Sequence, residues 1–147
     1  MLSVVQRVNS ASVSVDNLLY SNIEQGLLVL LGIEENDIIK DADYLIDKIL
    51  HLRIFNDKDN KMNRSVLDIQ GEIMVVSQFT LLANTSKGRR PSFIKAANPK
   101  IAQSLYKYFL DELKKHNLCI QSGKFGAHMD INLVNNGPAT FLLQSVV

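Results

Sequence analysis

The chain has 147 residues, of which 46% are hydrophobic and 21% charged, and its formal net charge at pH 7 is +1. This length predicts a single domain over residues 1–147 that buries about two thirds of its unfolded surface. The small net charge argues against a protein that wraps a long stretch of DNA or RNA. The longest apolar run, Leu27–Leu31, is too short to cross a membrane. The N-terminus shows no secretory signal, so we expect a cytoplasmic protein with no membrane and no DNA partner.

Cysteine and histidine content argues against two further classes of protein. The single cysteine, Cys119, excludes an intrachain disulfide framework, and its apolar neighbours predict that it is buried. The three histidines show no metal-ligand spacing, so we expect no metal site and no cofactor. The polar loop at residues 56–61 lacks the glycine and glutamate of a calcium loop.

The first third of the chain predicts a β-hairpin, a buried strand and a helix. Ser3–Val15 and Leu18–Ile23 are the hairpin strands, joined by an Asp-Asn turn. Leu27–Leu31 lies between two glycines and predicts a central strand buried on both faces. Asp37 is the expected N-cap of a helix that runs to about Leu50. Its predicted buried stripe is Ile38, Ala42, Leu45, Ile46, Ile49 and Leu50.

The remainder predicts more strands and a second long helix. Asn98 and Pro99 supply the N-cap and first turn of a helix that ends near His116. The predicted strands are Leu52–Phe55, Glu72–Leu82, Leu118–Ser122, His128–Val134 and Thr140–Val147. About eight strands joined mostly through hairpins predict an α+β fold with mostly antiparallel β-sheets, barrel-like or two-layer, and two long helices packed outside.

Charge is unevenly distributed along the chain. The segment from Lys87 to Lys107 carries six basic residues and no acid: Lys87, Arg89, Arg90, Lys95, Lys100 and Lys107. The segment from Glu34 to Asp47 carries six acids and one base. This asymmetry permits one local anionic partner, such as a few phosphates, or is simply a solvated face.

Two breaks interrupt predicted strands. Ser77–Thr80 places polar side chains within an apolar strand, so either the backbone leaves the sheet there or these groups face a ligand cavity. Residues 73–86 contain no acid, base or histidine, which makes Ser77 and Thr80 poor nucleophiles unless a distant base reaches them. Backbone amides around Gln78 and Phe79 remain candidates for stabilising an oxyanion.

The second break is the Gly137-Pro138 pair near the C-terminus. Proline cannot donate to a sheet ladder, and glycine adopts backbone angles that other residues avoid. Strands are therefore expected to end before the pair and resume after it. A plain hairpin turn is the simplest interpretation of such a pair.

Both breaks carry a resemblance to a known family. Ser77-Gln78-Phe79-Thr80-Leu81 and Asn136-Gly137-Pro138-Ala139-Thr140 resemble the paired signatures of the D-aminoacyl-tRNA deacylases. Other segments resemble that family in the same order, and together they cover essentially the whole chain: Val5–Val8, Gly26–Gly32, Lys87–Phe93 and Gly123–Met129. Asn136, Ala139 and His128 depart from the residues frequent in the family at those positions, namely aspartate, valine and an acid.

The resemblance implies a homodimeric hydrolase that cleaves the ester between tRNA and a D-amino acid, or glycine, and spares L-aminoacyl-tRNA. Gly137 and Pro138, joined by a cis peptide bond, would form a cross-subunit gate for chirality. The substrate's ribose 2′-hydroxyl would take part in catalysis, with a nucleophilic Thr80 as the alternative. The implied catalytic pocket holds Ser77, Gln78, Phe79 and Thr80, its substrate-binding walls hold Phe125, Ala127 and Met129, and weak contacts to tRNA fall to Lys87, Arg89 and Arg90.

Two other functions are compatible with the same residues. One is a non-catalytic module that binds an RNA end through the basic loop. The other is a structural dimer in which the Gly-Pro turn only connects strands.

Overall fold

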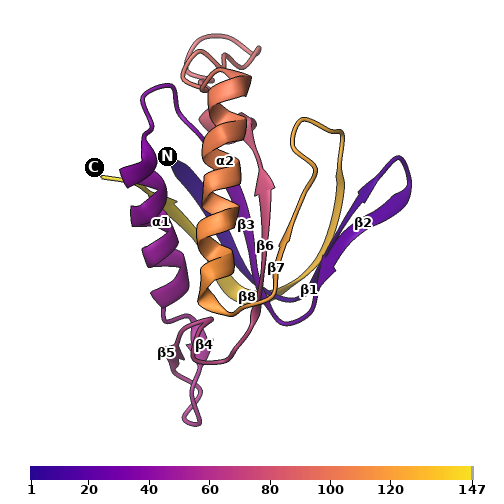
Figure 1. The fold of residues 1–147 in the computed structure, drawn as a ribbon, viewed down its shortest axis with the longest axis vertical. Helices are drawn as coiled ribbons and strands as arrows, with labels where there is room; N and C mark the ends of the chain where they lie inside the picture. The colour runs from indigo at the N-terminus through magenta and orange to yellow at the C-terminus, as the bar shows by residue number, and fades with distance from the viewer. Residues whose placement is uncertain (147) are drawn as a thin grey trace.

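The computed structural model describes residues 1–146 and has an α+β fold (Figure 1). Eight strands and two long helices, as predicted, follow one another within these residues. The elements are β1 Leu2–Val15, β2 Leu18–Ile23, β3 Gly26–Gly32, α1 Ile39–His51, β4 Phe55–Asn56, β5 Met62–Arg64, β6 Glu72–Ser77, the 3-10 helix η1 Phe79–Leu82, α2 Pro99–Leu113, the 3-10 helix η2 Lys114–His116, β7 Ile120–Ser122 and β8 Asp130–Gln144. The last predicted strand, Thr140–Val147, ends at Gln144, and Val147 lies outside the described residues.

The main sheet is organised around β1. This strand pairs antiparallel with β3 through Leu2–Val8, with β2 through Ala11–Val15, and with β8 along most of its length. Beyond β3, however, the pairs β3–β6 and β6–β7 are parallel. The sheet is therefore mixed and barrel-like, and the prediction of mostly antiparallel sheets joined by hairpins was wrong for this half. Parallel neighbours need long crossover connections, and α1 and α2 lie in those two connections.

Both helices cover the same face of the sheet (Figure 1). The main core lies between them and the sheet, where Leu27, Val29 and Leu31 of β3 are buried. The alternate residue Leu28 points to a second, smaller cluster with Val8, Val13, Ile23, Met74 and Val76. β3 is thus buried on both faces, as its continuous apolar run predicted. Within residues 1–146, no helix is long and apolar enough to span a bilayer.

The second helix begins as predicted, but the first does not. Asn98 caps α2, since its Oδ1 accepts a hydrogen bond from the Lys100 amide at 2.9 Å. In α1 the N-cap is Ile38, so the prediction of Asp37 was wrong. The side chain of Ile38 is exposed, so its place in the predicted buried stripe was wrong as well. The Asp37 carboxylate instead accepts hydrogen bonds from the Met1 ammonium at 2.5 Å and the Glu34 amide at 2.6 Å. Burial raises the pKa of Asp37 in spite of these partners.

Cys119 is exposed, although its apolar neighbours predicted burial. It lies just before β7, where its carbonyl accepts a hydrogen bond from the Ile73 amide of β6 at 2.9 Å while its side chain is open to solvent. The alternation that suggested a strand from Leu118 therefore begins two residues too early.

Candidate active site

Strand β6 leaves the sheet at the first polar break. After Ser77, the Gln78 amide donates to the Leu31 carbonyl at 2.8 Å, and the chain then turns into η1. Gly32 permits this close approach, because a Cβ there would lie 3.2 Å from the Gln78 carbonyl oxygen and 3.3 Å from Leu81 Cβ. The strand that was predicted over Glu72–Leu82 therefore ends at Ser77, and the polar break at Ser77–Thr80 marks the point where it stops.

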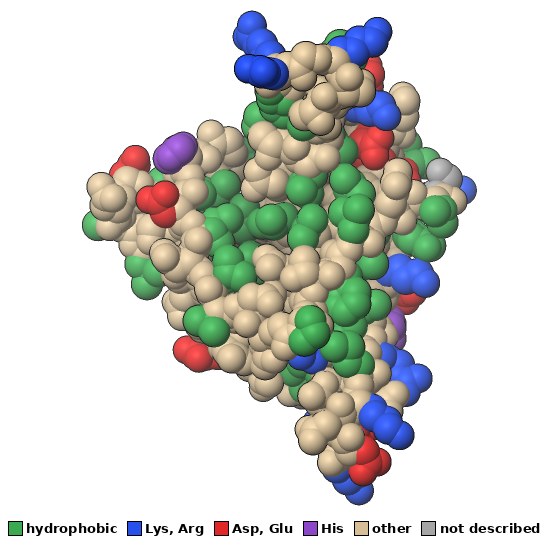
Figure 2. Space-filling view, turned by 180° about the vertical axis from the view of Figure 1, so that it is seen from behind, with side chains coloured by type: hydrophobic (Ala, Val, Ile, Leu, Met, Phe, Trp, Pro, Cys, Tyr) green, Lys and Arg blue, Asp and Glu red, His purple; other side chains and the backbone are tan. Residues whose placement is uncertain are grey.

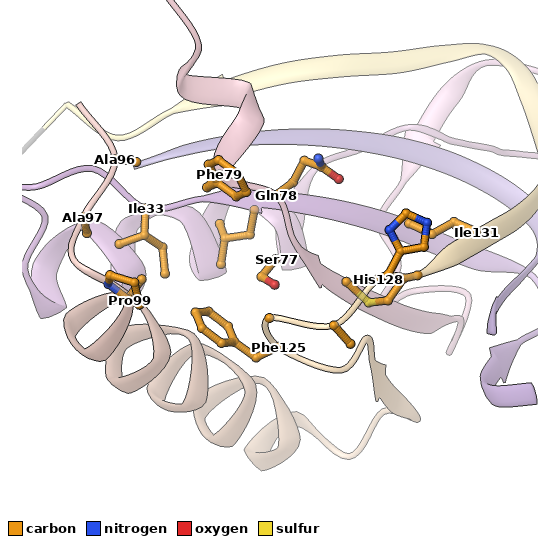
Figure 3. Close-up of a pocket in the computed structure, with 15 residues that line it drawn as sticks. Ile33, Ser77, Gln78, Phe79, Ala96, Ala97, Pro99, Phe125, His128 and Ile131 are labelled. Atoms are coloured by element: carbon orange, nitrogen blue, oxygen red, sulfur yellow. The ribbon is translucent and has the colours of Figure 1, made fainter. Parts of the chain in front are cut away.

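A cavity of about 460 Å³ opens beside this break (Figure 3). Its walls come from the ends of β3 and β6, the segment before α2 with the first turn of that helix, and the loop between β7 and β8. Most of the lining is apolar. The lining residues are Leu31, Ile33, Ser77, Gln78, Phe79, Ala96, Ala97, Pro99, Ala102, Phe125, Gly126, Ala127, His128, Met129 and Ile131.

The loop between β7 and β8 is held firmly against α2. Phe125 packs on Tyr106 with ring centroids 5.6 Å apart, and the Tyr106 hydroxyl donates to the Val75 carbonyl at 2.7 Å. Burial of this hydroxyl raises the pKa of Tyr106 well above its usual range, so it stays a neutral donor. Gly123 leaves room for Met129, whose sulfur would lie 2.7 Å from a Cβ at that position. Packing therefore fixes both Phe125 and Met129 in the wall.

The structure gathers six of the seven residues expected to form the pocket and its walls. Ser77, Gln78, Phe79, Phe125, Ala127 and Met129 all line the cavity. Thr80 does not: it is exposed on η1, and its hydroxyl accepts a hydrogen bond from the Gln78 side chain. Of the backbone amides considered for an oxyanion, that of Gln78 is already engaged by Leu31. The first amides of a helix lack an intrahelical acceptor, which leaves those of Phe79 and Thr80 as the candidates.

The cavity lacks the side chains of paired acid–base catalysis. Among the described residues that line it, His128 is the only ionisable one. His128 is exposed, and no hydrogen bond within residues 1–146 ties its ring to a carboxylate or to a serine. The residues before and within α2 that complete the wall, such as Ala97, Pro99 and Ala102, were not anticipated from the sequence. Their small or apolar side chains carry no chemical signal, and only the fold brings them to the cavity.

The second break is a large bulge in β8. Gln6 pairs with Thr140 and Val8 with Asn135, so residues 136–139 all face Arg7 alone on β1. Both flanks of the break pair with the same strand, which excludes a hairpin turn. The prediction of two separate strands, His128–Val134 and Thr140–Val147, was wrong, because one strand, β8, runs through the pair and only its register with β1 shifts. The peptide bond between Gly137 and Pro138 is cis. Gly137 does not have a positive φ, so the expectation that its special backbone angles are needed was wrong.

Arg7 holds the base of this bulge. Its guanidinium is buried and donates from Nε to the Asn136 carbonyl at 3.0 Å and from Nη2 to Asn136 Oδ1 at 3.2 Å. Nη1 donates to the Ile54 carbonyl at 2.5 Å and to Asn56 Oδ1 at 3.3 Å. The side-chain amide of Asn136 donates in turn from Nδ2 to Asn9 Oδ1 at 2.8 Å. The arginine therefore fixes the position from which Gly137 and Pro138 project.

Gly137 and Pro138 are exposed and do not line the cavity of their own chain. Further along the strand, Leu142 is 68% exposed and Val134 is 53% exposed. Hydrophobic side chains also gather over the middle of the face opposite the helices (Figure 2). In this chain alone, the bulge and the cavity are therefore separate features.

The basic loop lies beside the cavity. Asn84 and Ser92 close its base through two backbone hydrogen bonds of 2.8 and 3.0 Å, and Phe93 packs edge-on against Phe79 with centroids 5.1 Å apart. Between these anchors Lys87, Arg89 and Arg90 are exposed, and basic side chains project at the corresponding tip of the molecule (Figure 2).

Comparison with known proteins points to one family. The profile of the family described as D-Tyr-tRNA(Tyr) deacylase matches residues 4–144. A D-aminoacyl-tRNA deacylase of Thermosipho melanesiensis is 52% identical over 146 residues, covering 99% of this chain and 97% of its own. One of Clostridioides difficile is 51% identical over 145 residues, with the same coverage.

Two solved structures superpose over nearly the whole chain. One named c-Myc DNA Unwinding Element Binding Protein has a TM-score of 0.93 at 43% identity and covers 100% of both chains. A probable eukaryotic D-amino acid tRNA deacylase has a TM-score of 0.83 at 16% identity and covers 97% of both chains, a likeness of fold alone.

Proposed function

The chain belongs to the D-Tyr-tRNA(Tyr) deacylase family and is a hydrolase of D-aminoacyl-tRNA, and from that premise we propose that it also cleaves glycyl-tRNA and rejects L-aminoacyl-tRNA through a gate supplied by a second copy of the chain. The observation that carries this proposal is the cavity at the end of β6, which is lined almost entirely by apolar and backbone groups.

The cavity suits the end of an aminoacylated tRNA. A volume of about 460 Å³ lies in the range of small-molecule sites, large enough for an amino acid ester with part of its adenosine. Phe79 and Phe125 offer aromatic surfaces to an adenine or an aromatic side chain, while Ser77 and Gln78 supply hydrogen bonds. We assign substrate binding to these residues together with Ala127 and Met129.

The chemistry follows from what the lining lacks. Without a paired acid and base, the protein contributes mainly orientation of the substrate and backbone dipoles, and both can lower the barrier by several kcal/mol. The ribose 2′-hydroxyl, next to the ester, then serves to position or activate the attacking water. The water oxygen bonds to the ester carbonyl carbon, and the bond from that carbon to the 3′-oxygen breaks. The 3′-oxygen takes up a proton to regenerate the 3′-hydroxyl of tRNA, and the amino acid leaves as a carboxylate with release of one proton.

The gate explains why the bulge carries glycine. A Cβ on Gly137 would lie 2.9 Å from the side-chain oxygen of Asn135, which is exposed and can move, and 3.9 Å from the Ala139 amide nitrogen, an ordinary contact. Glycine is therefore not needed for packing within this chain. We propose that Gly137 and Pro138 enter the cavity of the partner subunit, where their carbonyls lie against the α-carbon of the substrate and exclude an L side chain. Glycine has no side chain to exclude, so glycyl-tRNA passes.

The test compares tyrosyl-tRNA in its D and L forms with glycyl-tRNA, on the wild-type protein and on Gly137→Ala. The wild-type protein is expected to hydrolyse the D and glycyl esters and to leave the L ester intact. Gly137→Ala should unfold at the wild-type temperature, because its added methyl group is exposed, yet hydrolyse D-tyrosyl-tRNA at least about tenfold more slowly, which corresponds to roughly 1.4 kcal/mol.

Three outcomes would contradict the proposal. Equal rates on the D and L esters would show that the protein has no gate for chirality. Wild-type rates for Gly137→Ala would show that Gly137 is not part of such a gate. Binding of tRNA without turnover would favour the non-catalytic module instead. Since one structural neighbour is named for binding DNA, a DNA duplex serves as competitor, and it should leave hydrolysis unchanged.

A further inference from the structure

Three lysines are each next in sequence to a residue that lines the cavity. Lys95 precedes Ala96, Lys100 follows Pro99, and Lys124 precedes Phe125. Figure 3 shows Pro99 at the start of α2 and Phe125 in the loop after β7, both among the residues around the cavity. The lysines therefore belong to three segments that supply the wall of one cavity: the loop before α2, its first turn and the loop after β7.

These lysines carry unneutralised charge. All three side chains are exposed, and within residues 1–146 none has a carboxylate oxygen within 4.0 Å. The acidic residues Glu34 and Glu35 near Lys95 do not neutralise its charge. The Glu35 amide donates to the Lys95 carbonyl, but its carboxylate makes no ion pair, and Glu34 faces the Met1 ammonium. By contrast, Lys114 and Lys115 of η2 pair with Asp111 and Glu112 in the last turn of α2.

Hydrogen bonds hold the backbone of all three lysines. The Lys95 carbonyl accepts from the Glu35 amide at 3.0 Å, the Lys124 carbonyl accepts from the Ala127 amide at 3.1 Å, and the Lys100 amide donates to the N-cap side chain of Asn98 at 2.9 Å. The points from which the three side chains leave the backbone are therefore fixed next to residues of the cavity wall.

We propose that Lys95, Lys100 and Lys124 bind the phosphodiesters of the single-stranded 3′ end of the tRNA as it leaves the cavity. This inference rests on the proposed function, since it takes the cavity as the site of the terminal aminoacyl-adenosine. The strand that follows this nucleoside carries one negative charge per residue, and an uncompensated ammonium group beside the cavity neutralises such charge with release of counterions. The basic loop with Lys87, Arg89 and Arg90 then lies farther along the path.

The test uses two D-tyrosyl esters: D-tyrosyl-adenosine, which has no phosphate, and the D-tyrosylated trinucleotide CCA, which adds two cytidines and the two phosphodiesters that join them. We expect the wild-type protein to prefer the trinucleotide. The variant K95A/K100A/K124A should lose about tenfold in kcat/KM on the trinucleotide and keep wild-type kcat/KM on the nucleoside ester. The slope of log kcat/KM against log salt should flatten by about 1.4, since the trinucleotide has two phosphodiesters and each single-strand phosphate contact contributes about 0.7.

The matched control removes three exposed lysines elsewhere. K48A/K58A/K61A changes the net charge equally, and Lys58 and Lys61 lie in the loop between β4 and β5, at the other end of the molecule from the basic loop (Figure 1). It should keep the trinucleotide preference.

The outcomes separate this inference from the function on which it rests. A K95A/K100A/K124A variant that keeps the trinucleotide preference would overturn the phosphate assignment, as would an equal loss on both esters or an equal loss in the control. A wild-type protein that hydrolyses neither ester would overturn the proposed function as well.

Discussion

Thr80 is the residue on which a covalent mechanism would depend, and its surroundings argue against that role. It lies outside the cavity lining, and its hydroxyl is engaged by the Gln78 side chain. No imidazole or carboxylate within residues 1–146 is hydrogen-bonded to it, so no base is placed to activate it.

We therefore expect Thr80→Ala to retain D-tyrosyl-tRNA hydrolysis within about fivefold of wild type, measured in single-turnover assays. Loss of a general base or nucleophile costs roughly 10² or more, which makes the two cases easy to separate. Thr85→Ala, an exposed threonine in the next loop, is the control. A hundredfold loss in a Thr80 variant that unfolds normally would establish a threonine nucleophile.

Single residues also show where sequence reasoning works. Ser77 and Gln78 were identified because polar groups in an apolar strand need an explanation, and the structure places both at a cavity where the strand ends. Pro99 and Ala102 could not be identified this way, since a proline and an alanine at the start of a helix look the same whether they face a cavity or solvent. Their role is created by the crossover that brings α2 next to β6.

At the scale of elements, the bulge of β8 depends on Arg7 of β1. Arg7 makes four hydrogen bonds in a buried setting, two of them to backbone carbonyls. Lysine has a single donor centre and cannot reach all these acceptors together.

Arg7→Lys is therefore expected to lower the free energy of unfolding by about 1–3 kcal/mol, the cost of leaving buried acceptors unpaired, as measured by urea denaturation. If the bulge carries the gate, the ratio of D to L hydrolysis should fall in parallel. Arg53→Lys is the control, because Arg53 forms a similar pair of bonds to Asn63 at the exposed surface. A destabilised variant with full selectivity would show that the gate does not rely on Arg7.

Elements differ in how well the sequence predicts them. Helix α2 was predicted closely because Asn98 and Pro99 act locally, through a side-chain cap and a fixed φ. The parallel pairing of β3, β6 and β7 was not, because an apolar strand has the same pattern whichever direction its neighbour runs. The start of α1 was misplaced because Asp37 is drawn away from the helix by the Met1 ammonium, a partner far away in sequence.

At the scale of the whole molecule, the proposed gate requires two chains. We expect the protein to sediment at twice the chain mass of 16.5 kDa. The variant V134D/L142D places carboxylates on exposed apolar positions of β8, where burial in an interface would leave a charge unpaired. It should sediment as a folded monomer and lose D-tyrosyl-tRNA hydrolysis.

Met62→Asp, at an exposed apolar residue of β5, is the control and should remain dimeric and active. A wild-type monomer that discriminates fully between D and L esters would rule out a gate carried by the partner.

The pairing of β1 with β8 has a consequence for synthesis of the protein. Arg7 and the Asn136 carbonyl that it binds are separated by 129 residues, so this contact closes a loop spanning nearly the whole chain. Loop closure over such a separation is slow compared with local helix and hairpin formation. Because the ribosome synthesises the N-terminal residues first, β1 cannot pair with β8 until the other strands have been synthesised. A nascent chain therefore has no ordered bulge until β8 has emerged and paired with β1.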